Sequence, residues 1–309
     1  MKIKTKVIVF LSIFILITGF ITNHISNMIV HPAWHHPGLD HNCSKSQMEY
    51  AKIVCIDNPE SAIREKFESI QLQTGTNSFV DGWYFPAPKK TDKIVIFVHG
   101  GGADRRNGYK LVPFLLKAGF SVLLYDSPNH GRSSNDGRGI SYGIRESEAF
   151  PIAVDWAMTK AGRVYVIATS VGASTVVLSR DKWVGKIRAI VFENPLLSLE
   201  RLLLASDLAK YLPEFYLSFL FDFVQLKSGF SIYDASPENY INNFPDIPVI
   251  VMHGTHDATI PFEHGKMFYE KLNVKNKQFF IAQDTDHCRV WDKYPVQFES
   301  LTLKLFSGK

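Results

Sequence analysis

A serine set between small residues is the first feature of the sequence with the means for covalent chemistry. Residues 164–174 read VYVIATSVGAS, so Ser170 directly follows an apolar, strand-like run and precedes a helix-like one. A nucleophilic serine needs a sharp strand-to-helix turn that exposes its hydroxyl, and small residues on either side permit that turn. Ala168 and Gly172 occupy those positions, although glycine is more usual than alanine at the first. Ser170 is therefore the candidate nucleophile of an acyl-transfer reaction.

A glycine run offers backbone N–H groups that would stabilise the oxyanion of the same reaction. KIVIFV at 93–98 leads directly into HGGG at 99–102. Acyl transfer needs two backbone N–H donors where the oxyanion develops, and glycine lets the backbone approach a substrate. We expect one donor from Gly101 and the other from Val171, the residue after the serine. The run lacks both G-x-G-x-x-G and the Gly-Lys-Ser/Thr of a P-loop, so it does not indicate a nucleotide site.

A serine hydroxyl also needs a base, and the base needs an acid that orients it. Asp257 lies in VMHGTHDATIP, just past an apolar run, and His287 lies in DTDHC, before the last helix-like segment. The chain order is Ser170, Asp257, His287, with spacings of 87 and 30 residues. This order and these positions make Asp257 the candidate acid and His287 the candidate base.

Other polar residues near these motifs are weaker candidates. Glu193 ends the strand-like run after the serine and is a second possible acid. Tyr142 and Arg145 are expected to lie exposed on a helix, with no assigned role. Loop, supporting or packing roles are expected for the remaining neighbours of the candidate acid and base: His253, His256, Asp284, Asp286 and Cys288.

The elements that must position these residues alternate between strand-like and helix-like segments from residue 70 onward. Short apolar runs predict strands at 70–73, 80–85, 93–98, 120–126, 164–168, 187–193, 248–253 and 277–282. Longer segments between them predict helices near 107–118, 143–160, 171–181, 262–273 and 290–307. The first two strands are expected to pair antiparallel around a turn or bulge at Asp81-Gly82. Strands that alternate with helices imply crossover units and a mostly parallel sheet.

One segment, residues 196–245, breaks this alternation. It is apolar, helix-like and rich in aromatic residues, and it separates two predicted strands. A ligand crevice in a parallel sheet opens at the carboxyl ends of the strands, where such an insertion would lie. We interpret it as a lid over a site for an apolar ligand, with an ordinary helical layer as the alternative.

Taken in order, these motifs resemble the α/β-hydrolase superfamily. The resemblance rests on HGGG at 99–102, YDSPNHGRS at 125–133, ATSVG at 168–172, HGTHDATIP at 253–261 and DTDH at 284–287. The branch that looks most similar is the membrane-anchored, lysophospholipase-like and serine-aminopeptidase-like hydrolases. The resemblance implies an α/β-hydrolase fold: an eight-stranded, mostly parallel sheet with helices on both faces and a small helical lid after the sixth strand.

The resemblance also implies roles for particular residues. It assigns the nucleophile to Ser170, the acid to Asp257 and the base to His287, and it assigns the oxyanion donors to Gly101 and Val171. The turn that carries Asp126, His130, Gly131, Arg132 and Ser133 is expected to be structural.

These roles predict a serine hydrolase that cleaves carboxylic esters or thioesters through an acyl-enzyme, with no metal or cofactor. The lid and the apolar N-terminus favour a small-molecule lipophilic acyl ester or lipid as substrate. A serine peptidase of the same fold is an alternative, which would need a carboxylate near the lid to hold a substrate amine. Four are present: Glu200, Asp207, Glu214 and Asp222. The other alternative is a catalytically silent, membrane-anchored binding protein.

The N-terminus predicts a targeting segment. Lys2, Lys4 and Lys6 precede VIVFLSIFILITGFIT at 7–22, and no charged residue follows until after Val30. The most apolar part would span about 24 Å as a helix, and the whole uncharged stretch about 36 Å, against a hydrocarbon core of roughly 30 Å. No A-x-A cleavage site follows, so we favour a membrane anchor over a cleaved signal peptide. The catalytic domain is then exported, to the periplasm or the extracellular or lumenal side, or secreted after cleavage.

These features divide the chain into a signal-anchor or signal peptide at 1–30, a juxtamembrane linker at 31–64 and a hydrolase domain at 65–309, with its lid at about 196–245. The linker holds four histidines without helical ligand spacing, so no metal site is predicted there: His31, His35, His36 and His41. Cys43 and Cys55 are able to pair in an oxidising compartment, which would leave Cys288 free.

The composition fits this assignment and excludes other classes. The 309 residues are 46% hydrophobic and 21% charged, close to ordinary globular usage. The net charge of +4 comes largely from the three N-terminal lysines, because no acidic residue precedes Asp40. The pI of 8.8 is therefore not the mark of a nucleic-acid surface, and no nucleic-acid partner is expected.

Overall fold

The computed structural model describes residues 2–35 and 59–308. The expectations for Cys43, Cys55, His36 and His41 concern residues outside these ranges. Within them, eight strands form one sheet in the order β1-β2-β4-β3-β5-β6-β7-β8. The strands are β1 (Glu68–Gly75), β2 (Ser78–Phe85), β3 (Lys93–Val98), β4 (Ser121–Tyr125), β5 (Arg163–Thr169), β6 (Ile187–Glu193), β7 (Val249–Gly254) and β8 (Lys277–Ala282).

The sheet is mostly parallel, as the alternation of segments predicts. β2 pairs antiparallel with both β1 and β4, and every other neighbouring pair from β4 to β8 is parallel. Parallel strands leave their carboxyl ends at the same edge of the sheet, so the loops that follow β3, β5, β7 and β8 meet there. The predicted fold class, an α/β-hydrolase fold, is confirmed.

The hairpin between β1 and β2 differs from its prediction. Asp81 and Gly82 lie inside β2, opposite Gln71 and Ile70, and the chain reverses between Gly75 and Ser78. A Cβ added at Gly82 would lie 2.8 Å from the backbone oxygen of Leu124 on β4. This glycine therefore permits close approach of a neighbouring strand, which the sequence does not distinguish from a turn.

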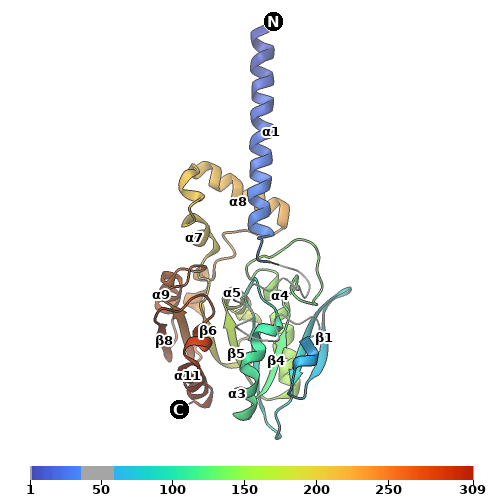
Figure 1. The fold of residues 1–309 in the computed structure, drawn as a ribbon, viewed down its shortest axis with the longest axis vertical. Helices are drawn as coiled ribbons and strands as arrows, with labels where there is room; N and C mark the ends of the chain where they lie inside the picture. Colours follow the sequence, from blue (N-terminus) through green and yellow to red (C-terminus); the bar gives the residue numbers. More distant parts are fainter. Residues whose placement is uncertain (1, 36–58, 309) are drawn as a thin grey trace.

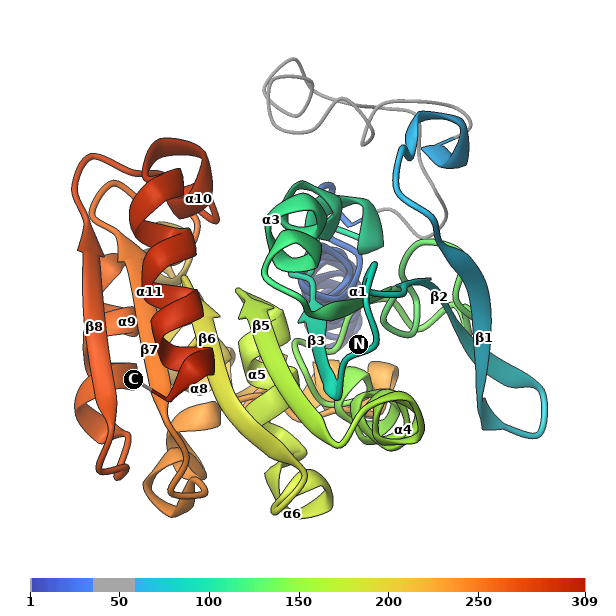
Figure 2. The same cartoon turned by 90° about the horizontal axis from the view of Figure 1, so that it is seen from below.

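Helices cover both faces of the sheet. Phe150 of α4 (Glu146–Lys160) and Phe268 of α9 (Phe262–Lys271) belong to one buried cluster, and Leu115 of α3 (Val112–Lys117) and Phe298 of α11 (Pro295–Ser307) belong to another. Figure 2 shows α3 and α11 on one side of the sheet and α4 and α5 (Val171–Leu178) on the other.

Strand β3 shows why its sequence is apolar throughout. Ile94, Ile96 and Val98 belong to the first cluster, whereas Val95 and Phe97 belong to the second. Successive side chains of a strand point to opposite faces, so a strand covered on both sides needs an apolar residue at each position.

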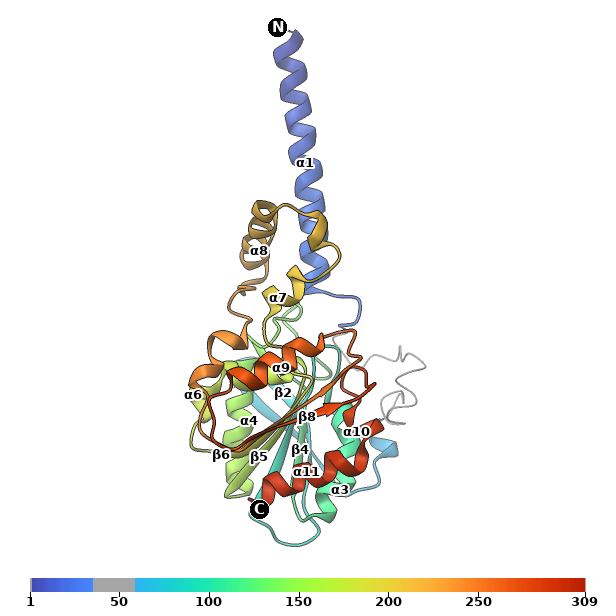
Figure 3. The ribbon, with the colours of Figure 1, turned by 90° about the vertical axis from the view of Figure 1, so that its left-hand side faces the viewer.

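The insertion at 196–245 lies between β6 and β7. It contains α7 (Leu199–Leu204) and α8 (Glu214–Ser228), with short 3-10 turns at Ala209–Tyr211, Pro237–Asn239 and Ile241–Asn243. In Figures 1 and 3, α7 and α8 rise from the edge of the sheet where the parallel strands end, and α8 lies beside α1. The remaining short elements are Pro59–Ala62, Arg105–Leu111, α6 (Arg180–Trp183) and α10 (Val290–Lys293).

The N-terminal helix α1 (Lys2–Val30) has two distinct parts. Apolar side chains from Val7 to Ile21 are largely exposed, and the helix is long and apolar enough to cross a membrane. Its last two turns instead pack against α8, where Ile25 and Ile29 join a buried cluster with Leu220 and Val224. The first part projects away from the rest of the chain (Figure 1).

Polar contacts accompany this packing. The hydroxyl groups of Thr22 and Tyr216 lie 2.8 Å apart, and the Lys227 ammonium group donates to the amide oxygens of Asn23 and Asn27 at 2.7 and 2.5 Å. Residues 1–30 are expected from the sequence to form a segment apart from the folded domain. The structure differs from this expectation, because the end of α1 packs on the insertion.

Candidate active site

Ser170 lies at the turn from β5 into α5. Its φ angle is +54°, a strained value for a residue with a side chain, and only 6% of its surface is exposed. The turn needs a glycine two residues later, because a Cβ at Gly172 would lie 2.3 Å from the backbone oxygen of Val98 on β3. Ala168 is accommodated, with its methyl group fully buried in the core. The tight strand-to-helix turn predicted from the sequence is present.

Asp257 and His287 lie together at the ends of neighbouring strands. Nδ1 of His287 lies 2.7 Å from Oδ2 of Asp257, which also accepts a 2.6 Å hydrogen bond from the Asn194 side chain. The other oxygen, Oδ1, accepts the backbone N–H groups of Thr259 and Ile260 at 2.9 and 2.8 Å. Four donors therefore hold this carboxylate in one orientation.

The surroundings of Asp257 favour its ionised form. Burial opposes ionisation, but hydrogen bonds from His253, His287 and the Ile260 N–H outweigh it and hold the pKa of Asp257 well below its ordinary value. Nε2 of His253 lies 3.3 Å from Oδ2 of Asp257 and 3.0 Å from the carbonyl oxygen of Ile260. Asp257 is thus a fixed negative charge beside the His287 ring.

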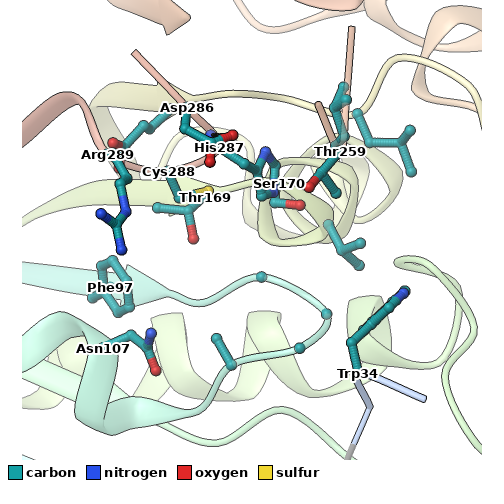
Figure 4. Close-up of a pocket in the computed structure, with 18 of the residues that line it drawn as sticks. Trp34, Phe97, Asn107, Thr169, Ser170, Thr259, Asp286, His287, Cys288 and Arg289 are labelled. Atoms are coloured by element: carbon teal, nitrogen blue, oxygen red, sulfur yellow. Dashed lines mark hydrogen bonds between the residues drawn. The ribbon is translucent and has the colours of Figure 1, made fainter. Parts of the chain in front are cut away.

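The imidazole of His287 responds to that charge. Burial opposes its protonation, whereas the hydrogen bond to the Asp257 carboxylate favours it, and the pKa of His287 lies above its ordinary 6.5. Burial raises the pKa of the neighbouring Cys288 thiol. Because Nδ1 faces a carboxylate, it keeps its proton, and Nε2 accepts one when the ring is neutral. In Figure 4 the His287 ring lies next to the Ser170 side chain, with the hydroxyl facing the cavity.

The glycine loop after β3 passes beside Ser170. A Cβ added at Gly100 would lie 3.0 Å from Cβ of Ser170, and one added at Gly101 would lie 3.2 Å from Cγ2 of Val171. His130 fixes this loop, since its Nε2 lies 2.8 Å from the Gly101 carbonyl oxygen and donates to it. The structure therefore brings Gly101 and Val171 together around the serine.

A cavity of about 520 Å³ opens over these residues. Figure 4 shows Ser170 and His287 in its middle, Trp34 at one end, and Asn107 and Arg289 at the other. Apolar side chains make up much of the lining: Phe97, Leu111, Tyr142, Val171, Leu196, Leu202 and Ile260. Charged and amide groups line it as well: Asn107, Lys110, Glu193, Asp286 and Arg289. The cavity therefore has apolar surface where Trp34 packs on Tyr142, and polar groups beside Phe97 at the opposite end.

The rival acid, Glu193, is placed differently. Its Oε1 accepts the backbone N–H of Val290 at 2.9 Å, and burial raises its pKa. His287 is hydrogen-bonded to Asp257 instead. His256 and Asp284 form an exposed pair whose closest atoms are 3.4 Å apart. The structure therefore leaves Glu193 in the wall of the cavity rather than at the imidazole.

Two residues expected to lie on an exposed helix surface are buried, so that prediction is wrong. Tyr142 is 6% exposed, lines the cavity and donates its hydroxyl proton to the Ile29 carbonyl oxygen at 2.8 Å. Arg145 is 8% exposed and donates to the carbonyl oxygens of Ser228 and Gly139 at 3.0 and 2.8 Å. Their partners belong to α1, the insertion and a loop, which helical spacing alone does not show.

The turn after β4 forms a buried polar cluster. Asp126 accepts the backbone N–H groups of Arg105 and Arg132, each at 2.8 Å, and Ser133 donates to its carbonyl oxygen at 2.6 Å. Arg105 also contacts the Asp81 carboxylate. Burial raises the pKa of Asp126 to about 7. Every one of these contacts lies within the protein, in line with the structural role expected for this turn.

Two residues at the site have no strong signal in the sequence. Asn194 follows Glu193 and adopts a positive φ of 47°, which places its amide against Asp257. Trp34 comes from the segment after α1 and lines the cavity. Residues 31–64 are expected to form a linker, but within the described part of that range Trp34 lines the cavity and His35 packs on His130.

No group of three or more His, Cys, Asp or Glu side chains within residues 2–35 and 59–308 is arranged to hold a metal ion.

Known proteins are similar to this chain in sequence and fold. Residues 93–233 match the profile of a family described as having the alpha/beta hydrolase fold. The chain is 27% identical over 223 residues to YqkD of Bacillus subtilis (strain 168), covering 68% of this chain and 70% of that one. It is 27% identical over 199 residues to ABHD12B of Homo sapiens, covering 61% of this chain and 52% of that one.

A solved structure is similar over most of the chain. An esterase of Pyrococcus furiosus superposes with a TM-score of 0.64 at 24% identity, covering 81% of this chain and 93% of that one. The family match spans β3 to the insertion and includes the turn at Ser170. The family match and the order of strands in the sheet agree, so the chain has the α/β-hydrolase fold.

Proposed function

We propose that this protein is a serine hydrolase that cleaves carboxylic esters with an apolar acyl chain, through an acyl-enzyme intermediate. The observation that carries the proposal is the group at the strand ends: Ser170 on its strained turn, beside a His287 ring that Asp257 holds through Nδ1 at 2.7 Å. A nucleophile, a base and an orienting acid are the three parts that acyl transfer requires.

In the first half of the reaction, Nε2 of His287 takes the Ser170 proton while Oγ attacks the acyl carbonyl carbon. The tetrahedral intermediate then collapses, and the protonated imidazole gives its proton to the leaving alcohol. In the second half, water attacks the acyl-enzyme with His287 again as the base, which releases the acid and restores the serine. Asp257 holds the tautomer and stabilises the imidazolium in both halves.

The oxyanion is assigned to the backbone N–H groups of Gly101 and Val171. Their positions next to each other and to Ser170 support this assignment, as does the hydrogen bond from His130 to the Gly101 carbonyl oxygen, which holds the loop in place. Donors that are already held in place lose little free energy to reorientation when charge develops, which is why such groups contribute strongly to catalysis.

The apolar side chains that line the cavity support a lipophilic acyl group as substrate. The Pyrococcus furiosus esterase of similar fold supports ester chemistry. We further propose that α1 anchors the chain in a membrane with its lysines on the cytoplasmic side, which places the site near the lipid surface. A peptidase is less well supported, because four carboxylates proposed to hold an amine lie outside the cavity: Glu200, Asp207, Glu214 and Asp222.

Hydrolysis of p-nitrophenyl esters with two to sixteen carbons tests this function, with the full-length protein in detergent and Ser170→Ala as its matched blank. We expect Ser170-dependent hydrolysis and labelling of Ser170 by a fluorophosphonate probe. A folded protein that hydrolyses no ester and resists the probe would contradict the proposal. Parallel acyl-thioester substrates decide between the two bond types.

A further inference from the structure

The segment that follows α1 forms part of the cavity wall. Trp34 lines the cavity and packs edge-to-face against Tyr142, with ring centroids 6.3 Å apart. It remains 46% exposed, whereas Tyr142 is 6% exposed and Val171 is 6% exposed. The indole is therefore the wall residue at this end with the most apolar surface left for a ligand to cover.

The glycine run permits this position. A Cβ added at Gly102 would lie 3.1 Å from the Trp34 ring, and one added at Gly101 would lie 3.2 Å from it. Any side chain at either position would push the indole away from the loop. The indole thus lies directly against the backbone to which we assign an oxyanion donor.

Hydrogen bonds on both sides of Trp34 hold it there. Before it, the Ile140 N–H donates to the Val30 carbonyl oxygen at 3.0 Å, and the Tyr142 hydroxyl donates to that of Ile29 at 2.8 Å. After it, Nε2 of His35 donates to the Asn129 carbonyl oxygen at 3.0 Å.

His35 also contacts the support of the glycine loop. Its ring packs edge-to-face on His130, with centroids 4.7 Å apart, and His130 holds the Gly101 carbonyl. Burial lowers the pKa of His35 to about 4, so it is a neutral donor at pH 7. The segment is thereby attached to the loop it covers, and Trp34 is a held part of the site.

We propose that Trp34 is a specificity-determining residue, an apolar platform on which the acyl chain of the substrate packs at the end of the cavity nearest α1. This inference rests on the proposed function and extends it, since it assigns the chain-binding surface to a residue outside the hydrolase domain predicted at 65–309. It also makes the end of the membrane helix and the acyl site one continuous structure.

The test compares full-length Trp34→Ala, Trp34→Phe and Trp156→Ala in detergent, using p-nitrophenyl acetate and p-nitrophenyl decanoate. Trp156 is the matched control, because it is a half-buried indole that packs edge-to-face on Tyr84 at 5.2 Å and lies outside the cavity. For Trp34→Ala we expect the ratio of kcat/KM for decanoate over acetate to fall at least about tenfold, mainly through KM, since apolar contacts of this kind discriminate by 10- to 200-fold.

The phenyl ring of Trp34→Phe should restore the ratio to within about threefold, and Trp156→Ala should leave it within twofold. A ratio for Trp34→Ala that stays within twofold or rises would overturn the inference, as would an equal fall in Trp156→Ala. Melting temperatures show whether each variant is folded, and Trp34→Phe keeps the test informative if alanine destabilises the chain.

A readout without turnover separates this inference from the proposed function. Decanoate binding is measured by calorimetry in full-length Ser170→Ala, with and without Trp34→Ala. At least about tenfold weaker binding without the indole supports the platform even if no ester is hydrolysed, and equal binding contradicts it. Loss of the proposed function is seen separately, as wild-type hydrolysis that does not depend on Ser170.

Discussion

The two ends of the site are held in different ways. Ser170, Asp257 and His287 follow β5, β7 and β8, and the hydrogen-bonded ladder of a parallel sheet positions the ends of those strands. Trp34 and the end of α1 are held by packing on α8 and by a few hydrogen bonds to the loop at 129–142. The chemistry thus depends on the core of the fold, whereas the binding wall depends on contacts between separate segments.

The strongest test of this difference removes the nucleophile. Ser170→Ala should lower kcat by roughly 10³–10⁶, because knockouts of such a group remove the covalent route and leave only binding and electrostatic effects. The melting temperature should stay close to that of wild type, since the change removes one oxygen at the cavity surface. A folded variant that keeps wild-type activity would contradict the assignment of the whole strand-end group.

Replacing the acid probes the next largest effect. Asp257→Asn should lower kcat by about 10²–10⁴, because an amide no longer holds the correct tautomer of His287 or stabilises its charge. Glu193→Gln is the control, as this carboxyl group lines the same cavity but bonds to the Val290 N–H. If the glutamine variant shows the larger loss, the acid has been assigned to the wrong residue.

The pH profile of hydrolysis tests the coupling between His287 and Asp257. The raised pKa of His287 keeps the imidazole protonated to higher pH than an ordinary histidine, and a base must be neutral to accept a proton. We expect kcat/KM to rise about tenfold per pH unit below that pKa and to level off above it. In Asp257→Asn the midpoint should move to lower pH; an unchanged midpoint would mean that the carboxylate does not set it.

The smallest expected effect concerns the binding wall. Tyr142→Phe removes the hydroxyl that donates to the Ile29 carbonyl oxygen and should cost about 1 kcal/mol of stability, the usual net contribution of one hydrogen bond. The decanoate-to-acetate ratio should fall by about threefold while acetate hydrolysis is unchanged. An equal loss with both esters would place Tyr142 with the strand-end group and weaken the division between the two ends.

The sheet and the positions of the strand-end residues could be predicted from the sequence, because both depend on local patterns. A strand buried on both faces is apolar at every position, and the residue that follows it must lie at the edge of the sheet. Ser170 and Asp257 follow such runs closely, and His287 follows the weaker, partly exposed run of β8, so their meeting at one edge could be predicted before any contact was known. Gly82 shows the limit of local patterns, since close approach of β4 and a turn both call for glycine.

The contacts around the cavity wall could not be predicted from local patterns. Tyr142 bonds to a residue 113 positions away, and Arg145 bonds across 83 positions to Ser228. Their own neighbours suggested an exposed helix, because nothing in a short window shows which distant segment will cover it. Asn194 was missed for a related reason: its positive φ turns the amide toward Asp257, and the sequence does not encode that direction in a visible pattern.

The sequence by itself determined the parallel sheet, the turn at Ser170 and the order of the candidate nucleophile, acid and base, because each depends on periodicity or on adjacency to a buried strand. Only the tertiary structure decided which carboxylate reaches His287, where the end of α1 packs, and that Trp34 lies on the glycine loop. These depend on the free energy of packing between segments far apart in the chain, which no local pattern carries.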